Sequence, residues 1–283
     1  MRLLLFLFAF QLSAWASTYD VRISELDHGE ETLIFLSNGI VAKLKNQPLI
    51  LQRLKELQAS QQPIRIELDK QRRIQRLSDL STKSKTFERK ILSVSDFKPS
   101  IIPSLTIAKT IFQSARYVSK ESQCYNRAHI WAFEWFQKYG LNSEKTFLFF
   151  TRKYIRKYNF EWWFHVAPSV QVIDGPNVEE RIMDVKYALG GPLRLKNWTD
   201  IFMRNDAACP IISKYSEYAN YPESDWCYVM KVSMHYYQPI DMELLEDTSA
   251  IKEGWIESEL SAAYLEAFNQ VWPQESEVSH EWY

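Results

Sequence analysis

Three side chains in the sequence have the types needed for nucleophilic catalysis: Cys124, His165 and Asp184. A cysteine thiolate is a strong nucleophile, a histidine can carry protons for it, and a carboxylate can hold the histidine in one tautomer. Together they would attack a carbonyl carbon and transfer its acyl group through a thioester. That chemistry requires the fold to bring together residues that lie far apart in the sequence.

The predicted helix from Cys124 to Tyr139 begins at the candidate nucleophile and is ended by Gly140. Apolar residues at i+4, i+7 and i+11 share the face of Cys124, so we expect this helix to be mostly buried. A thiol at a helix N-terminus faces the positive end of the helix dipole, which favours the nucleophilic thiolate. The alternative is an inert core cysteine, and the helix pattern alone does not separate the two.

The candidate histidine and carboxylate fall on two predicted strands that a turn near Asp174 connects. A two-residue turn at Asp174 and Gly175 would place His165 directly opposite Asp184. A four-residue turn would place Ala167 there instead, with His165 on the diagonal. In either register both side chains lie on one face of the sheet, where the carboxylate can orient the imidazole. The alternative is a solvated cross-strand pair without a catalytic role.

The first sixteen residues have the pattern of a secretory signal. Arg2 supplies a positive start, residues 3–12 are apolar, and Ala14-Trp15-Ala16 is a cleavage site. The apolar stretch is shorter than the roughly 20 residues that span a bilayer, and no later segment is long enough. We therefore expect residues 1–16 to be removed and the protein to be exported, to a periplasm or beyond it.

Export affects the interpretation of the three cysteines, because thiols tend to pair in an oxidising compartment. Cys209 and Cys227 share a loop-rich stretch, and Cys124 is far from both. We expect a bridge between Cys209 and Cys227, worth about 3 kcal/mol through restriction of the unfolded chain, and a free thiol at Cys124. On the cysteine count alone, a bridge that includes Cys124 stays possible.

The composition argues against several classes of partner and cofactor. With 34 basic and 35 acidic residues, the chain has no overall field to attract nucleic acid or an anionic membrane. Only 7 glycines are present and no phosphate-binding loop pattern occurs. No cluster has metal-ligand spacing, and His129 lies about 140° around its helix from Cys124, so we expect it to anchor the core. We therefore expect neither a cofactor nor a metal ion.

The remaining pattern predicts two units joined by an exposed, basic, Ser/Thr-rich linker over residues 78–90. The first unit, residues 17–92, is expected to contain a hairpin turn at Asn38-Gly39. Its other expected elements are strands 19–23, 32–36, 40–44, 64–68 and 74–77 and helix 49–57. For the second unit, residues 96–283, we expect helices 105–117, 124–139 and 260–268 and strands 146–155, 162–173, 181–187 and 226–235. Helices combined with a run of antiparallel strands give an α+β domain.

Three short blocks agree in order, spacing and flanking residues with one known family. They are Cys124-Tyr125-x-Arg127-Ala128-His129, Trp162-x-x-His165-Val166-Ala167, and Arg181-Ile182-x-Asp184 with Gly191-Pro192 and Trp198 after it. These blocks resemble those around the nucleophile, histidine and aspartate of the bacterial protein-glutaminases, also called protein-glutamine deamidases. Outside them the resemblance fades, and the tail from Pro239 to Tyr283 has no counterpart that we can place.

The resemblance implies a papain- or transglutaminase-like α+β core, in which a helix bearing Cys124 packs on an antiparallel sheet bearing His165 and Asp184. It also implies that residues 17–92 are an inhibitory pro-region and that residues 96–283 are the catalytic domain. The implied activity is hydrolysis of glutamine side-chain amides in proteins or peptides, with no cofactor. The implied partners are those substrates and, as an intramolecular inhibitor, the chain's own N-terminal region.

Two rival functions stay open on the sequence. The same three residues would serve a transglutaminase-like acyltransferase or a cysteine protease. A non-catalytic exported binding protein could also keep the fold. For any acyl-transfer reaction an oxyanion hole is required, and the backbone N–H of Cys124 is the natural first donor. Gln123 or Ser122 is a candidate second donor by proximity only.

Overall fold

The computed structural model of the 283-residue chain describes most of the sequence between residues 17 and 268. The described residues are 17–80, 97–116, 123–204, 207–220, 226–243, 252 and 254–268. The expected signal peptide, most of the linker and the last part of the tail lie outside them. The chain divides into two compact units, one of residues 1–36 and 40–83 and one of residues 37–39 and 84–283.

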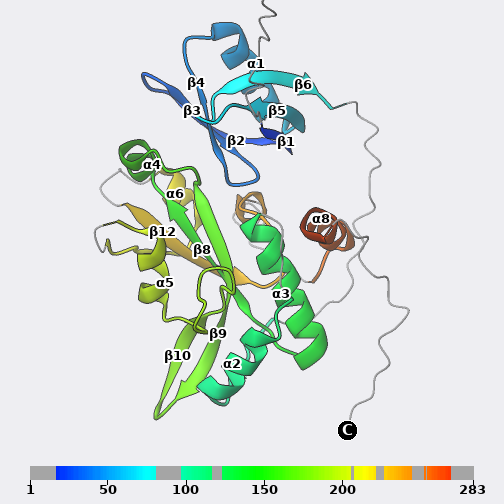
Figure 1. Cartoon of the computed structure of the whole chain (residues 1–283), viewed down its shortest axis with the longest axis vertical. Helices are drawn as coiled ribbons and strands as arrows, with labels where there is room; N and C mark the ends of the chain where they lie inside the picture. The colour runs from blue at the N-terminus through cyan, green and yellow to red at the C-terminus, as the bar shows by residue number, and fades with distance from the viewer. Residues whose placement is uncertain are drawn as a thin grey trace, which may run out of the picture. The chain divides into compact units, whose positions relative to one another are not determined.

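The first unit consists of two small antiparallel sheets and one helix (Figure 1, blue to cyan). Its elements are β1 (Ser17–Val21), β2 (Ile23–Asp27), β3 (Thr32–Leu36), β4 (Val41–Leu44), α1 (Pro48–Ser60), β5 (Ile64–Leu68) and β6 (Ile74–Asp79). The sheets have the orders β1-β5-β6 and β2-β3-β4. Alternating apolar residues of the strands and two leucines of α1, Leu54 and Leu57, form its core. The predicted Asn38-Gly39 turn connects β3 to β4, and Gly39 has the positive φ of 87° that favours glycine.

The second unit is a mixed α+β fold around one six-stranded sheet (Figure 1). Its elements are β7 (Ile101–Ile102), α2 (Leu105–Gln113), α3 (Cys124–Tyr139), β8 (Glu144–Phe150), α4 (Arg152–Tyr158), β9 (Phe164–Asp174), β10 (Asn177–Ile182), α5 (Leu195–Phe202), β11 (Ile211–Ile212), α6 (Tyr215–Asn220), β12 (Cys227–Ser233) and α8 (Glu257–Phe268). The strand order is β10-β9-β8-β12-β11, with the short β7 pairing with β9. The β10-β9-β8-β12 pairs are antiparallel, whereas β7 and β11 pair in parallel.

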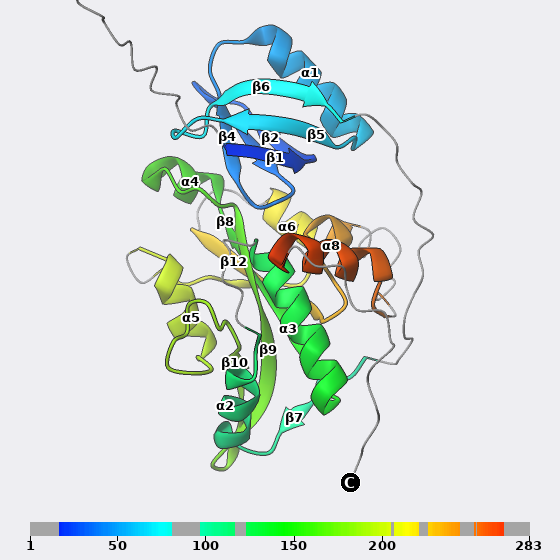
Figure 2. The same ribbon diagram turned by 45° about the vertical axis from the view of Figure 1, so that its right-hand side comes forward.

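Helix α3 lies along the sheet, and α8 packs beside it (Figures 1 and 2). The central strand β8 is buried along almost its whole length, which explains its run of phenylalanines. Phe147, Phe149 and Phe150 are all fully buried and contact other aromatic rings. Most of the chain's aromatic residues in this unit therefore build the core.

Two predicted strands of the second unit end well beyond the observed ones, and in each case a local hydrogen bond explains the difference. Strand β8 ends at Phe150 because the Thr151 side chain accepts a hydrogen bond from the N–H of Tyr154 and starts helix α4. Strand β10 ends at Ile182, since the carbonyl of Asp184 accepts hydrogen bonds from the N–H groups of Tyr187 and Ala188 and turns the chain. Helices α4, α5 and α6 and the short strands β7 and β11 were not predicted.

The cysteine pairing expected from the sequence is confirmed. Cys209 and Cys227 are bridged, with Cα atoms 4.9 Å apart, and Cys124 is free. The bridge ties the first residue of β12 to the loop before β11. It leaves Cys124 as the chain's one unbridged cysteine.

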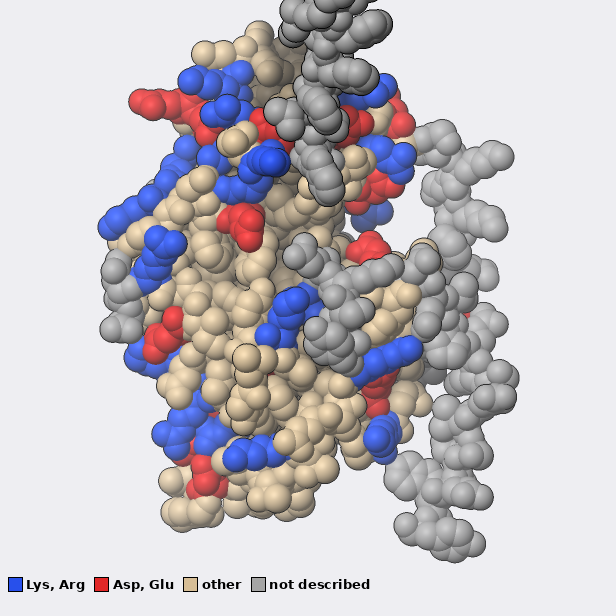
Figure 3. Space-filling view, viewed as in Figure 1, with Lys and Arg blue, Asp and Glu red and all other residues tan. Residues whose placement is uncertain are grey.

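Charged side chains of both signs are interspersed over the face of the molecule in Figure 3. Among the helices of the described residues, we find none with the length and apolar character of a membrane span.

Candidate active site

Cys124 is the first residue of helix α3, whose bounds are those predicted from the sequence. The helix ends at Gly140, which has a φ of 63° and whose N–H donates to the Phe136 carbonyl at 2.9 Å. At the other end, Gln123 precedes the helix without a capping hydrogen bond from its side chain. The first N–H groups of a helix have no intrahelical acceptor, so the N–H of Cys124 is available to a ligand. Cys124 is partly exposed, whereas the residues that follow it in the helix, from Tyr125 to Phe133, are buried.

His165 and Asp184 are in direct contact. The Nε2 atom of His165 lies 2.7 Å from Oδ2 of Asp184, and each side chain is 1% exposed. His165 lies in β9, and Asp184 lies just beyond the end of β10. The structure therefore brings these two candidate residues together on one face, as both sequence registers required.

The hairpin between β9 and β10 has the second of the two predicted registers. Asn177 pairs with Asp174 across the turn, and beyond the strand the N–H of Met183 donates to the Pro168 carbonyl at 2.8 Å. The same register sets Asp184 across from Ala167, with His165 on the diagonal. We expected this register to need a four-residue turn. The observed turn is shorter, because Asp174 pairs with Asn177 and only Gly175 and Pro176 lie between them.

Cys124 lies close enough to His165 to affect the charge state of its imidazole. Burial by itself lowers the pKa of His165, but the charge and hydrogen bond of Asp184 and the contact with Cys124 outweigh it and raise this pKa to about 9. His165 is therefore an imidazolium at neutral pH. Because Nε2 faces Asp184, Nδ1 is the ring nitrogen left for the thiol.

Asp184 is kept ionised by its neighbours. Burial raises its pKa, but the charge of His165, hydrogen bonds from His165 and Trp198, and the charge of Arg127 together lower the pKa below the usual value. The indole Nε1 of Trp198 donates to Oδ2 at 2.9 Å, so one carboxylate oxygen contacts both the ring of His165 and that of Trp198. This arrangement fixes the orientation of the carboxylate and, through it, of the imidazole.

Aromatic rings surround the imidazole of His165. Their ring centroids lie 4.4 to 6.1 Å from that of His165, and they belong to Trp162, Tyr187, Trp198 and Phe202. Two of them come from α5, which the sequence analysis missed. The signal was present, since Leu195, Trp198 and Phe202 have the i, i+3, i+7 spacing of an amphipathic helix. By excluding water, these rings strengthen the interaction between His165 and Asp184.

Two other histidines are buried in different surroundings. His129 is fully buried, and its Nδ1 lies 2.6 Å from the Nζ of Lys145, on the core side of α3. His235 is also fully buried, near Trp255. Within the described part of the chain, no group of His, Cys, Asp and Glu side chains is arranged to hold a metal ion.

Comparison with known proteins relates one segment of the chain to a known family. Residues 104–202 match a family model described as glutaminase, and that segment includes Cys124, His165, Asp184 and Trp198. This match confirms the resemblance to the protein-glutaminase family that the three sequence blocks indicated. Among curated proteins, no sequence matches the chain.

Two solved structures share the fold of the chain. One is the crystal structure of pro-protein-glutaminase, with a TM-score of 0.53 and 12% identity over 88% of this chain and 92% of that one. The other is the A47Q2 mutant of pro-protein-glutaminase, with a TM-score of 0.51 and 14% identity over 79% of this chain and 85% of that one. At such identities the two structures bear on the fold alone.

Proposed function

We propose that the chain is a cysteine hydrolase that deamidates glutamine side chains in proteins or peptides, leaving glutamate and releasing ammonia. The observation that carries this proposal is the buried contact of His165 with Asp184, with Cys124 near enough to raise the pKa of the same imidazole. The glutaminase family model covers all three residues. Their roles are nucleophile, proton carrier and orienting carboxylate, in that order.

In the first half of the reaction, the thiolate of Cys124 attacks the side-chain carbonyl carbon of glutamine. The C–N bond then breaks, and ammonia leaves with the proton that His165 carries as an imidazolium. A pKa of about 9 suits this donor, because the ring is charged at neutral pH and still transfers its proton to a strong base. The product of this half is a thioester between Cys124 and the former glutamine side chain.

In the second half, water replaces the thiol. Neutral His165 removes a proton from the attacking water, the C–S bond breaks, and the glutamate side chain is released with Cys124 restored. One water is consumed and one ammonia is produced in each cycle. Asp184 stays ionised throughout, because it orients the ring and stabilises its cationic form.

The oxyanion of each tetrahedral intermediate needs two hydrogen-bond donors. The first is the backbone N–H of Cys124 at the start of α3, which has no intrahelical acceptor. We favour Gln123 for the second, because its side chain does not cap the helix. Ser122 lies outside the described residues.

We further propose that this core is of the papain or transglutaminase type. The features that support this are the nucleophile on the first residue of α3, the packing of α3 against β9, and the histidine on β9 followed by the carboxylate after β10. In this arrangement one helix and one hairpin position all three residues.

We propose also that the protein is exported and made in a latent form. Residues 1–16 would direct export and be removed. The N-terminal unit, which the sequence delimits as residues 17–92, would act as a pro-region that blocks the site. The support for latency is that both solved relatives are pro-protein-glutaminases and that the match to the first covers 88% of this chain.

The rival activities differ in which amide is attacked or in which acceptor takes the acyl group from the thioester. Water as acceptor gives deamidation, an amine gives a crosslink, and attack on backbone amides gives new N-termini. The test is to incubate a glutamine-rich protein with the chain, cleaved in its linker, and to measure ammonia, crosslinks and new N-termini together. Ammonia alone supports the proposal, crosslinks or new N-termini support a rival enzyme, and none of the three supports a binding protein.

A further inference from the structure

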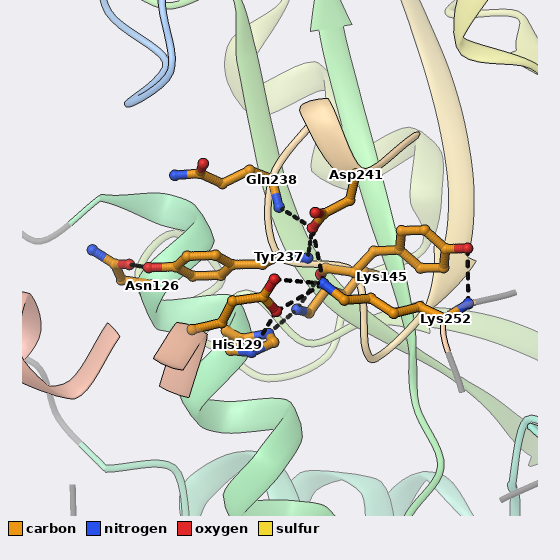
Figure 4. Close-up of polar contacts among 9 residues, drawn as sticks. Asn126, His129, Lys145, Tyr237, Gln238, Asp241 and Lys252 are labelled. Carbon is orange, nitrogen blue, oxygen red and sulfur yellow. Dashed lines mark hydrogen bonds and ion pairs between the residues drawn. The ribbon is translucent and has the colours of Figure 1, made fainter. Parts of the chain in front are cut away.

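A buried network of polar side chains joins the C-terminal part of the second unit to the helix that carries Cys124 (Figure 4). It lies outside residues 104–202, the segment that the glutaminase model matches, except for its members on α3 and β8. Its members come from α3, β8, the chain after β12, and α8. They are Asn126, His129, Lys145, Tyr236, Tyr237, Gln238, Asp241, Lys252 and Glu259.

The network holds one peptide bond from both sides. The Nζ of Lys145 donates to the carbonyl of Tyr236 at 2.5 Å, and the N–H of Tyr237 donates to Oδ2 of Asp241 at 2.7 Å. These two backbone groups are the two ends of the same peptide unit. The side chain of Tyr237 is therefore presented from a backbone that cannot rotate without breaking a buried hydrogen bond.

The charges within the network reinforce this arrangement. Lys252 contacts Asp241 at 3.2 Å and Glu259 at 2.7 Å, which connects the chain after β12 to the start of α8. Burial and the charges of Lys145 and Lys252 hold the pKa of His129 well below its usual value. His129 is therefore neutral and accepts at Nδ1 the hydrogen bond from Lys145, whose Nζ lies 2.6 Å away.

From this fixed position Tyr237 contacts the first turn of α3. Its hydroxyl donates a hydrogen bond to Oδ1 of Asn126, and its ring meets that of Tyr125 edge-on, with centroids 5.1 Å apart. Asn126 is fully buried and donates in turn to Glu266 of α8 at 2.5 Å. The two residues that follow Cys124 are thus both held by the C-terminal segment.

The first turn of α3 is not held by a side-chain hydrogen bond from its own N-cap residue. Gln123 makes no side-chain capping bond, so the usual local means of fixing a helix N-terminus is missing there. Tertiary contacts from Tyr237 and Glu266 supply what the cap does not. A shift of this turn would change the distance between Cys124 and His165 and the direction of the Cys124 N–H.

We propose that Tyr237 and Asn126 are positioning residues, through which the C-terminal residues 236–243 and 254–268 hold Cys124 in line with His165. This inference rests on the proposed role of Cys124 as nucleophile. The C-terminal part of the chain lies outside the three sequence blocks. The proposal gives it a role in the active site without contact with the substrate.

The test compares two tyrosines that each join the C-terminal part of the chain to α3, at different distances from Cys124. Tyr237→Phe removes the hydroxyl that holds Asn126. Tyr264→Phe is the matched control, because Tyr264 donates from α8 to Glu134 of α3 at 2.9 Å, almost three turns away from Cys124. For each variant of the full chain, cleaved in its linker, we would measure kcat and KM for ammonia release, the rate of Cys124 alkylation by iodoacetamide against pH, and the Tm.

We expect Tyr237→Phe to lower kcat by about tenfold to a hundredfold, as small displacements of a reacting group do, and to leave KM close to that of the wild type. It should also slow alkylation of Cys124. Tyr264→Phe should behave as the wild type in both assays. Wild-type kcat and alkylation in Tyr237→Phe would overturn the proposal, and so would equal losses in the two variants.

A second pair of variants applies if Tyr237→Phe does not fold. Glu266 is exposed, so its replacement leaves the core intact. Glu266→Ala removes the acceptor for Asn126 and should slow alkylation, whereas Glu266→Gln keeps an acceptor oxygen and should restore most of the rate. Equal rates in these two variants would overturn the proposal.

Alkylation separates this inference from the proposed function. If the wild type releases no ammonia, deamidation is wrong, and the alkylation rates still decide whether Tyr237 positions Cys124. If ammonia is released and Tyr237→Phe is indistinguishable from the wild type, deamidation stands and the positioning role is wrong.

Discussion

The charge of Asp184, whose Oδ2 lies 2.7 Å from Nε2 of His165, governs the protonation of that histidine. Both side chains are 1% exposed, and burial alone would leave the imidazole neutral at physiological pH. Asp184 and Cys124 outweigh that effect and raise the pKa of His165 to about 9. The resting site therefore contains a proton ready for the leaving group.

Asp184→Asn should move the alkaline limit of activity to lower pH. The substitution removes the charge that does most to raise the pKa of His165, so this pKa falls and the ring loses its proton at lower pH. We expect kcat to fall by about two to four orders of magnitude, as when the carboxylate of a catalytic triad is replaced. The pH dependence of kcat/KM measures the shift. An unchanged alkaline limb would mean that Asp184 does not control His165.

Cys124 should be the only cysteine that iodoacetamide modifies at mildly acidic pH. The imidazolium of His165 stabilises a neighbouring thiolate, and the bridge protects Cys209 and Cys227. Peptide mapping of the labelled chain, cleaved in its linker and not reduced, gives the site and the pairing. His165→Ala should slow the labelling greatly. Equal labelling of all three cysteines, or none at Cys124, would contradict the assigned nucleophile.

Trp198→Phe should reduce activity because it removes the indole N–H that contacts Asp184. A hydrogen bond to a charged group is worth about 1.5–3 kcal/mol, so we expect roughly a tenfold or greater loss in kcat. Trp135→Phe is the matched control. Trp135 is equally buried, and its Nε1 has no hydrogen-bond partner among the described residues. Equal effects of the two substitutions on kcat would show that Trp198 contributes only packing.

Cleavage of the linker should increase activity. A tethered inhibitor has an effective concentration of about a millimolar or more, so even a weak pro-region blocks the site until it is released. The linker lies outside the described residues, and trypsin-like cleavage within residues 83–90 is the expected event because exposed basic linkers are readily nicked. Ammonia release from a glutamine peptide is measured before and after cleavage. Equal rates would make the N-terminal unit a permanent partner domain.

The sequence predicted the elements whose signals are local. The bounds of α3 followed from its periodicity and from Gly140, and the contact of His165 with Asp184 followed from the alternation of two strands. The ends of β8 and β10 were predicted less well, because single hydrogen bonds at Thr151 and Asp184 turn the chain there. The sequence pattern predicts regular helices and strands well, but it predicts a boundary poorly where a single hydrogen bond ends the element.

The positioning network could not have been predicted, because it consists of contacts between distant parts of the chain. Lys145 and Tyr236 are 91 positions apart, and Asn126 and Tyr237 are 111 apart. Lys145 lies in a strand otherwise rich in apolar residues, and nothing in its neighbourhood indicates a buried amine. Only the fold shows that β8, α3 and the chain after β12 meet there.

The central claim is that Cys124 converts glutamine side chains to glutamate. Its most direct test is mass spectrometry of a glutamine-containing protein after incubation with the chain cleaved in its linker, beside Cys124→Ala prepared in the same way. We predict glutamate at former glutamine positions, with equimolar ammonia, for the wild type and no conversion for the variant. Intact glutamines in the wild-type reaction, or equal conversion by Cys124→Ala, would contradict the claim.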